Sequence, residues 1–105
     1  MDIKYEVILT ERAELELNDI YDYIANTLME EKTANKLMNK IQNDILLLGD
    51  TPEGFAIIEN NKIRGLEYRR LTINNYVAIY RVDKESKKVY VVRIIYGGRN
   101  YLNEL

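Results

Sequence analysis

The side chains available for chemistry in this chain fall within a narrow set, since none of its 105 residues is a histidine or a cysteine. Without cysteine, the chain has no thiol nucleophile, no disulfide and no cysteine-ligated zinc. Without histidine, it lacks the commonest general base and the commonest metal ligand. Any reaction would therefore use arginine, lysine, tyrosine or a carboxylate, and we expect neither a cofactor nor a metal ion.

Arginines and tyrosines alternate in the last third of the chain, and they are the strongest candidates for a site. Nine tyrosines stand against one phenylalanine and no tryptophan, and the arginines of this region are Arg69, Arg70, Arg81, Arg93 and Arg99. Guanidinium groups grip phosphates and tyrosine rings stack on bases, so the pattern is typical of a surface for an anionic target. Composition alone favours another interpretation, in which the tyrosines form sheet core and the arginines form cross-strand ion pairs.

The net charge of −2 conceals a separation of charge along the chain. Residues 1–61 hold 5 Lys/Arg against 13 Asp/Glu, whereas residues 62–105 hold 10 against 4. This division indicates two faces with different partners, although acidic helices placed before a mixed-charge sheet would also produce it. Asp19 and Asp22 lie close together on a predicted helix, where paired carboxylates more often form a solvated face than a catalytic pair.

Two predicted helices precede the arginine-rich region. A β-rich run covers residues 3–9, and Thr10 is a candidate N-cap for a helix that has Glu11 and Glu14 in its first turn. Apolar residues then recur at helical spacing as far as Leu28, and again from Ala34 to Leu48, with a break around residues 29–32. So short a link predicts an antiparallel hairpin. We expect the hairpin to bury five residues against a sheet: Ile20, Ile24, Leu37, Ile41 and Ile45.

Three β-runs follow a polar, turn-rich connection at residues 50–65. The runs are 67–73, 76–83 and 88–96, joined by Asn74-Asn75 and by the polar residues 83–87. Short turns make such strands an antiparallel meander. The order β-α-α-β-β-β therefore predicts an α+β fold, with a helical hairpin packed on one face of an antiparallel sheet, in a single domain covering residues 1–105.

The composition and the first residues suggest a protein of the cytoplasm. Apolar residues make up 47% and charged residues 30%, which is typical of a globular chain. No apolar run approaches the 18 residues or so of a membrane-spanning helix, so we expect no membrane partner. The start, Met1-Asp2-Ile3-Lys4, lacks the layout of a signal peptide.

Three segments carry a resemblance to a known family. They are Tyr68-Arg69-Arg70-Leu71, Asn75-Tyr76-Val77-Ala78-Ile79-Tyr80-Arg81-Val82 and Val91-Val92-Arg93-Ile94-Ile95-Tyr96-Gly97-Gly98-Arg99-Asn100-Tyr101. Their order and spacing resemble the C-terminal signature of RelE/ParE toxins of type II toxin–antitoxin systems. The helical half is similar too, and Ile20-Tyr21-Asp22-Tyr23-Ile24-Ala25 is closer to the ParE side. The resemblance covers nearly the whole chain.

The resemblance implies roles for particular residues. Arg70 and Arg99 match the family's functional arginines and would be the catalytic residues of a nuclease, with Arg69, Arg81 and Tyr101 secondary. The same five residues would form a target-binding surface. Two positions depart from the pattern: Val77 stands where RNA-cleaving members place an arginine, and Tyr96 stands where many members have histidine.

The resemblance also implies a function, with alternatives. The first is a bacterial ParE-like toxin that inhibits growth by blocking DNA gyrase, is neutralised by a cognate antitoxin and serves plasmid stabilization. The second is a RelE-like endoribonuclease (an mRNA interferase) that acts on mRNA in the ribosome. The third is an inactive member that retains only antitoxin binding. Val77 and the long helical hairpin favour the first.

Overall fold

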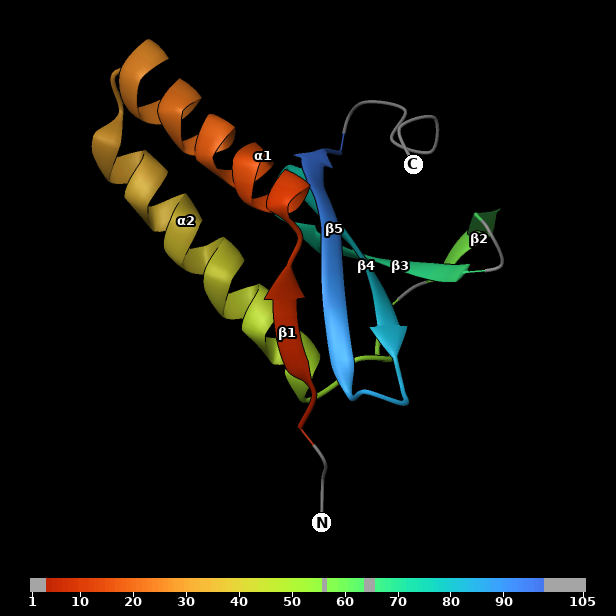
Figure 1. Ribbon diagram of the computed structural model, residues 1–105. Helices are drawn as coiled ribbons and strands as arrows, with labels where there is room; N and C mark the ends of the chain where they lie inside the picture. Colours follow the sequence, from red (N-terminus) through yellow and green to blue (C-terminus); the bar gives the residue numbers. More distant parts are fainter. Residues whose placement is uncertain (1–3, 56, 64–65, 98–105) are drawn as a thin grey trace.

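The protein folds as a helical hairpin against a five-stranded sheet, as Figure 1 shows. This computed structural model describes residues 4–55, 57–63 and 66–97, with the backbone alone for 58–63 and 66. In chain order the elements are β1 (Glu6–Leu9), α1 (Glu11–Asp22), a π-helical segment (Tyr23–Thr27), α2 (Glu31–Leu46), a 3-10 turn (Leu47–Gly49), β2 (Ile57–Ile63), β3 (Leu66–Ile73), β4 (Tyr76–Asp83) and β5 (Lys88–Tyr96). The α+β class and the helical hairpin predicted from the sequence are confirmed.

The sheet has the order β1-β5-β4-β3-β2 and is mixed. The meander of β3, β4 and β5 is antiparallel as predicted, and β4 and β5 have the predicted bounds. The first strand, expected to be antiparallel like the others, instead runs parallel to β5 at one edge. A parallel neighbour requires a long crossover connection, which the helical hairpin and the meander together provide.

The connection predicted at residues 50–65 contains a strand that the sequence did not indicate. β2 (Ile57–Ile63) pairs antiparallel with β3, through a register shift between Ile57 and Lys62. Its middle, Glu59-Asn60-Asn61-Lys62, has no alternation of apolar and polar residues. Edge strands often carry such polar residues and bulges, because an apolar edge would promote aggregation. Pairing with β3, rather than local propensity, therefore explains this strand.

Local sequence signals fix the ends of the helices. Thr10 caps α1 as predicted, because its hydroxyl oxygen accepts a hydrogen bond from the amide of Ala13 at 3.2 Å. α1 continues as the π-helical segment Tyr23–Thr27, and Met29 then adopts a left-handed backbone with φ 58°. This turn falls inside the predicted break and reverses the chain into α2. None of the described helices is long and apolar enough to cross a membrane.

The main core lies between the hairpin and the sheet. Of the five helical residues predicted to be buried, Ile24, Leu37, Ile41 and Ile45 are buried, and Ile20 is half-buried against the same cluster. The sheet contributes Tyr80, which is fully buried, among other residues. A second, smaller cluster of Val77, Ile79 and Ile95 lies on the sheet face opposite the helices.

The edge of β5 beyond the short strand β1 is covered by the start of α1. Thr10 donates hydrogen bonds from its amide and its hydroxyl to the carbonyls of Val91 and Val92. Six residues further on, a carboxylate oxygen of Glu16 accepts a hydrogen bond from the amide of Ile94 at 2.9 Å. The other oxygen of Glu16 binds the guanidinium of Arg93 at 2.7 Å, and Arg93 is only 7% exposed. The helix therefore replaces the missing part of strand β1.

This arrangement predicts that Glu16 contributes more to stability than any other acidic residue of α1. The change Glu16→Ala removes the carboxylate that binds the buried Arg93, and losing one partner of a buried pair costs about 3 kcal/mol or more. We expect a fall in melting temperature of about 10 °C or more. The matched control Glu14→Ala, at an exposed position, should change stability by less than about 0.5 kcal/mol. Equal melting temperatures of the two variants would contradict this role.

Candidate functional site

The arginines predicted to form the site are divided between the two faces of the sheet. Arg70 pairs with Ile79 on β4, and Ile79 belongs to the cluster on the face away from the helices, so Arg70 shares that open face. Arg81 also shares it, opposite Tyr68. Arg69 pairs with the core residue Tyr80 and so lies on the helix side. Adjacent residues of a strand point to opposite faces, and Arg69 and Arg70 follow this rule.

Arg70 lies at a shallow cavity of about 360 Å³ on the open face. Its side chain is exposed, and Thr72, Val77, Tyr96 and Gly97 are among the lining residues. The amide of Gly97 donates to the carbonyl of Asn75 at 2.8 Å. A Cβ at Gly97 would lie 3.0 Å from Val77 Cγ2, so the end of β5 can approach β4 this closely because the residue is glycine.

The two departures from the family pattern, Val77 and Tyr96, both line this cavity. Val77 is 4% exposed and packs with Ile79 and Ile95, so its position is a filled apolar site and not an exposed cationic one. Tyr96 is 50% exposed and meets the ring of Tyr76 edge to face, with the ring centroids 5.9 Å apart. Among the described residues that line the cavity, Arg70 is the one cation.

Arg81 and Arg69 both have partners within the protein. The guanidinium of Arg81 lies over the ring of Tyr90, 4.5 Å from its centroid, which is a cation–π contact on the open face. Arg69 donates to the carbonyls of Phe55 at 2.8 Å and Glu53 at 3.2 Å, and it binds the carboxylate of Glu67 at 3.3 Å. Arg69 therefore fastens the segment before β2 to the sheet.

The remaining sequence candidates lie outside the site or outside the described residues. Arg99 and Tyr101 belong to the part of the chain that the structure does not describe, so their predicted roles stay predictions. Asp19 and Asp22 are exposed on α1, as a solvated helix face would be. No group of three or more carboxylates among the described residues could hold a metal ion.

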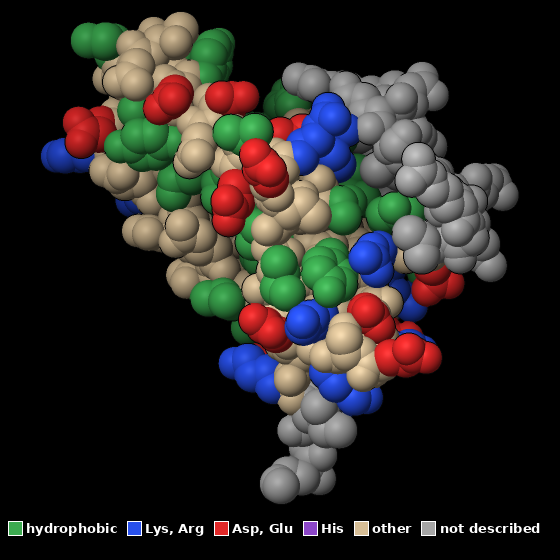
Figure 2. Space-filling view, viewed as in Figure 1, with side chains coloured by type: hydrophobic (Ala, Val, Ile, Leu, Met, Phe, Trp, Pro, Cys, Tyr) green, Lys and Arg blue, Asp and Glu red, His purple; other side chains and the backbone are tan. Residues whose placement is uncertain are grey.

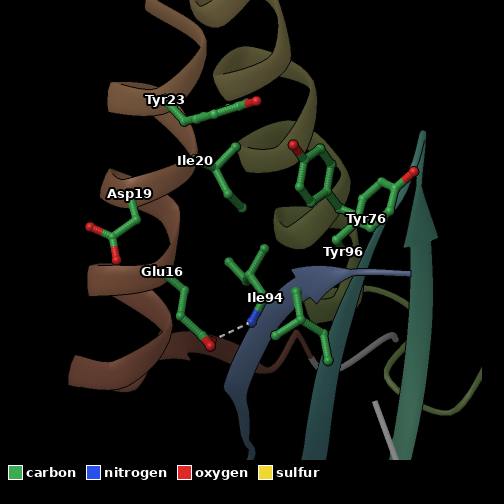
Figure 3. A pocket seen from close by; sticks show the side chains of 8 residues that line it. Glu16, Asp19, Ile20, Tyr23, Tyr76, Ile94 and Tyr96 are labelled. Atoms are coloured by element: carbon green, nitrogen blue, oxygen red, sulfur yellow. Dashed lines mark hydrogen bonds between the residues drawn. The ribbon is translucent and has the colours of Figure 1, made fainter. Parts of the chain in front are cut away.

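The structure also shows a groove that the sequence did not indicate, between α1 and the end of β5. Its volume is about 600 Å³, and Figure 3 shows Ile20 and Ile94 in its middle, with Tyr23 reaching from the π-helical segment toward Tyr76. Burial, and then the neighbouring Tyr96 and Tyr23, raise the pKa of Tyr76, so its hydroxyl stays protonated. The groove joins side chains from α1, β4 and β5, and no local pattern in the sequence links these residues.

Solved structures from toxin–antitoxin systems share this fold. A chain of the chromosomal ParDE system from P. aeruginosa is similar, with a TM-score of 0.71 and 22% identity over 90% of this chain and 98% of that one. A chain of the archaeal RelE–RelB complex from Pyrococcus horikoshii OT3 gives a TM-score of 0.64 and 17% identity over 91% and 98%. The isolated E. coli RelE toxin gives a TM-score of 0.58 and 19% identity, over 95% of this chain and 92% of that one.

The fold is thus that of the RelE/ParE-like toxins. Residues 7–101 match the family described as the ParE toxin of the type II toxin–antitoxin system parDE. The chain belongs to this ParE toxin family, as its sequence predicted. No sequence among curated proteins matches it.

The buried Tyr80 predicts how stability depends on alkaline pH. Its hydroxyl donates to the carbonyl of Pro52 at 3.1 Å, and burial raises the pKa of Tyr80 to about 12. Since the folded value exceeds the unfolded value of about 10, the stabilisation is complete below pH 10 or so and is lost as the pH rises through the folded value.

The variant Tyr80→Phe tests this dependence. Near neutral pH we expect it to be less stable by about 1 kcal/mol, because the hydrogen bond to Pro52 is lost. Between about pH 10 and 12 the difference should shrink, because only the wild type has the Tyr80 phenol, which ionises more easily in the unfolded chain than in the folded one. Urea unfolding of both proteins across this range measures the difference, and a constant difference would refute the explanation.

Proposed function

We propose that this protein is a ParE-like toxin that inhibits bacterial growth in the cytoplasm by binding and blocking DNA gyrase, and that a cognate antitoxin neutralises it. The proposal rests on the residues that line the cavity at Arg70. The cavity beside it has a buried Val77 in place of a second cation, and the other described lining residues are uncharged. Such a surface supports binding better than it supports phosphoryl chemistry.

The energetics of RNA cleavage support this preference. A nuclease without histidine or metal must stabilise a crowded phosphate with several fixed cations, and each such contact is worth about 2.7–4 kcal/mol in the transition state. Val77 packs with Ile79 and Ile95. The side chain of a neighbouring arginine therefore cannot take its place without opening that cluster. Arg81 is held over Tyr90 on the open face, and Arg69 is bound on the other face.

Blocking an enzyme requires only a complementary surface. Arg70 and Arg81 lie on the same open face from adjacent strands, and Tyr68 pairs with Arg81 beside them. Basic and aromatic side chains on one face suit an acidic partner surface, and arginine and tyrosine are common anchors at interfaces. In the proposal Arg70 and Arg81 contact the target, together with Arg99 and Tyr101. Arg69 contributes by holding β3 in place.

The antitoxin is the second proposed partner. The similar structures include ParDE and RelE–RelB complexes, in which toxin-like chains occur with antitoxins. Antitoxins of this kind supply a helix or an extended segment that gains main-chain hydrogen bonds and fills apolar grooves. We expect a tight heteromeric complex and a free toxin that arrests growth.

Purified protein distinguishes the possible targets. We expect the wild-type chain to inhibit supercoiling by DNA gyrase, and to leave a reconstituted translation reaction unaffected at the same concentration. Ribosome-dependent cleavage of mRNA with normal supercoiling would instead identify the endoribonuclease. An absence of both effects, in cells and in vitro, would identify a member that retains only antitoxin binding.

Charge reversal on the open face is expected to abolish growth arrest without unfolding the protein. Arg70→Glu and Arg99→Glu, expressed separately, should restore colony counts by a factor of about 10² or more, because they repel an acidic target. Lys32→Glu makes the same change at an exposed position on α2 and should remain toxic. Thermal melts establish that each variant is folded. Full toxicity in both folded arginine variants would place the site elsewhere.

A further inference from the structure

The groove between α1 and the end of β5 is lined on its helical side by residues of one helix face. Glu16, Asp19, Ile20 and Tyr23 follow the spacing i, i+3, i+4 and i+7, which brings side chains into one row along a helix. Figure 3 shows this row, with the two carboxylates at one end, Ile20 in the middle and Tyr23 at the other end. The groove therefore has polar ends and an apolar middle.

The strands complete the apolar and the aromatic parts of the groove. Ile94 of β5 joins Ile20 in the middle, and Tyr76 and Tyr96 join Tyr23 at the aromatic end. The rings of Tyr76 and Tyr96 meet edge to face, with their centroids 5.9 Å apart. Tyr23 is 55% exposed and Tyr96 is 50% exposed, so a small molecule in the groove can reach both rings.

The charges along the helical side of the groove are mostly negative. The α1 helix carries five acidic residues and one arginine, and Figure 2 shows acidic side chains over the helical hairpin. Glu16 is paired with Arg93, whereas Asp19 is exposed and forms no ion pair with a described residue. No lysine or arginine is among the described residues that line the groove. Asp19 therefore leaves a negative charge at one end.

The aromatic end attracts positive charge as well. The face of an aromatic ring binds an ammonium or guanidinium group within about 6 Å of its centroid, more strongly where water is excluded. Arg81 makes this contact with Tyr90 elsewhere in the chain, at 4.5 Å. Within the part of the chain that the structure describes, no lysine or arginine lies over the three tyrosine rings of the groove. These rings are therefore available to a cation from outside.

A linear aliphatic amine with two or more ammonium groups combines the features that this lining requires. Asp19 and Tyr23 are four positions apart, so the two ends of the groove are about 6 Å apart along the helix axis. A short methylene chain spans this distance and places an ammonium group at each end. An inorganic cation has no apolar part for Ile20 and Ile94, and a nucleotide would bring phosphates against Asp19.

We propose that this groove binds a linear aliphatic polyamine. One ammonium group lies at Asp19, the methylene chain lies against Ile20 and Ile94, and a second ammonium group lies against the rings of Tyr23 and Tyr96. The site goes beyond the proposed function, because it requires neither the target nor the antitoxin. Binding is measured on the chain alone, so a chain that binds the amine without arresting growth counts against the toxin proposal only.

Putrescine, a diamine with a short methylene chain, is the probe that tests the site. Titrated into the isotope-labelled full chain, it should shift the amide resonances of Ile20 and Ile94 in a saturable manner. Butylamine, which has one ammonium group, should bind about tenfold more weakly, and butanediol should not bind. Magnesium chloride at the same ionic strength should leave these resonances unchanged. Shifts of the same resonances with magnesium, or no saturation with putrescine, would overturn the proposal.

A pair of charge variants tests the carboxylate end. Asp19→Asn should weaken putrescine binding by about fivefold, because one ammonium group loses its partner. Asp22→Asn makes the same change on the same helix, at an exposed residue that does not line the groove, and should bind normally. Equal weakening by both variants would show that putrescine only collects in the negative field of the hairpin, and the proposal would fail.

A second pair tests the aromatic end. Tyr23→Leu removes a ring from a half-exposed position and should weaken binding by about fivefold, whereas Tyr23→Phe keeps the ring and should bind as the wild type does. Thermal melts establish that both variants are folded. If the two variants bind putrescine equally, the ring does not contact the ammonium group and the proposed site is wrong.

Discussion

The arrangement of this molecule depends on a single carboxylate at the edge of its sheet. Strand β1 ends at Leu9, too early to cover the whole edge of β5. Further along that edge, Glu16 accepts the hydrogen bond of the Ile94 amide. The same carboxylate neutralises the buried Arg93 and so connects α1 to β5 at two points. This contact therefore anchors α1 beside β5, along the groove that reaches Tyr96.

The sequence predicted those parts of the fold whose signals are local. Thr10, the apolar stripes of the helices and the β-rich runs each depend on neighbours within a few residues, and the bounds of β4 and β5 were found from them. The parallel pairing of β1 and the existence of β2 depend on distant partners. The register shift beside Ile79 on β4 was equally hidden, because a bulge leaves no periodic signal.

The candidate site was predictable to the same extent. Strand alternation places Arg69 and Arg70 on opposite faces, but it could not show that Arg69 donates hydrogen bonds to the carbonyls of Phe55 and Glu53. The groove could not be predicted at all, because Ile20 and Ile94 lie far apart in the sequence and come together only when the helices pack on the sheet. Arg93 is an arginine on a strand, as Arg70 is, but its guanidinium binds Glu16 on α1.

The two proposed surfaces meet at a pair of tyrosines. Tyr76 and Tyr96 line both the groove beside α1 and the cavity at Arg70, and their rings are in contact. Tyr96 is thus a ring that lines both surfaces. A molecule held in the groove would therefore touch a residue that also lines the Arg70 cavity.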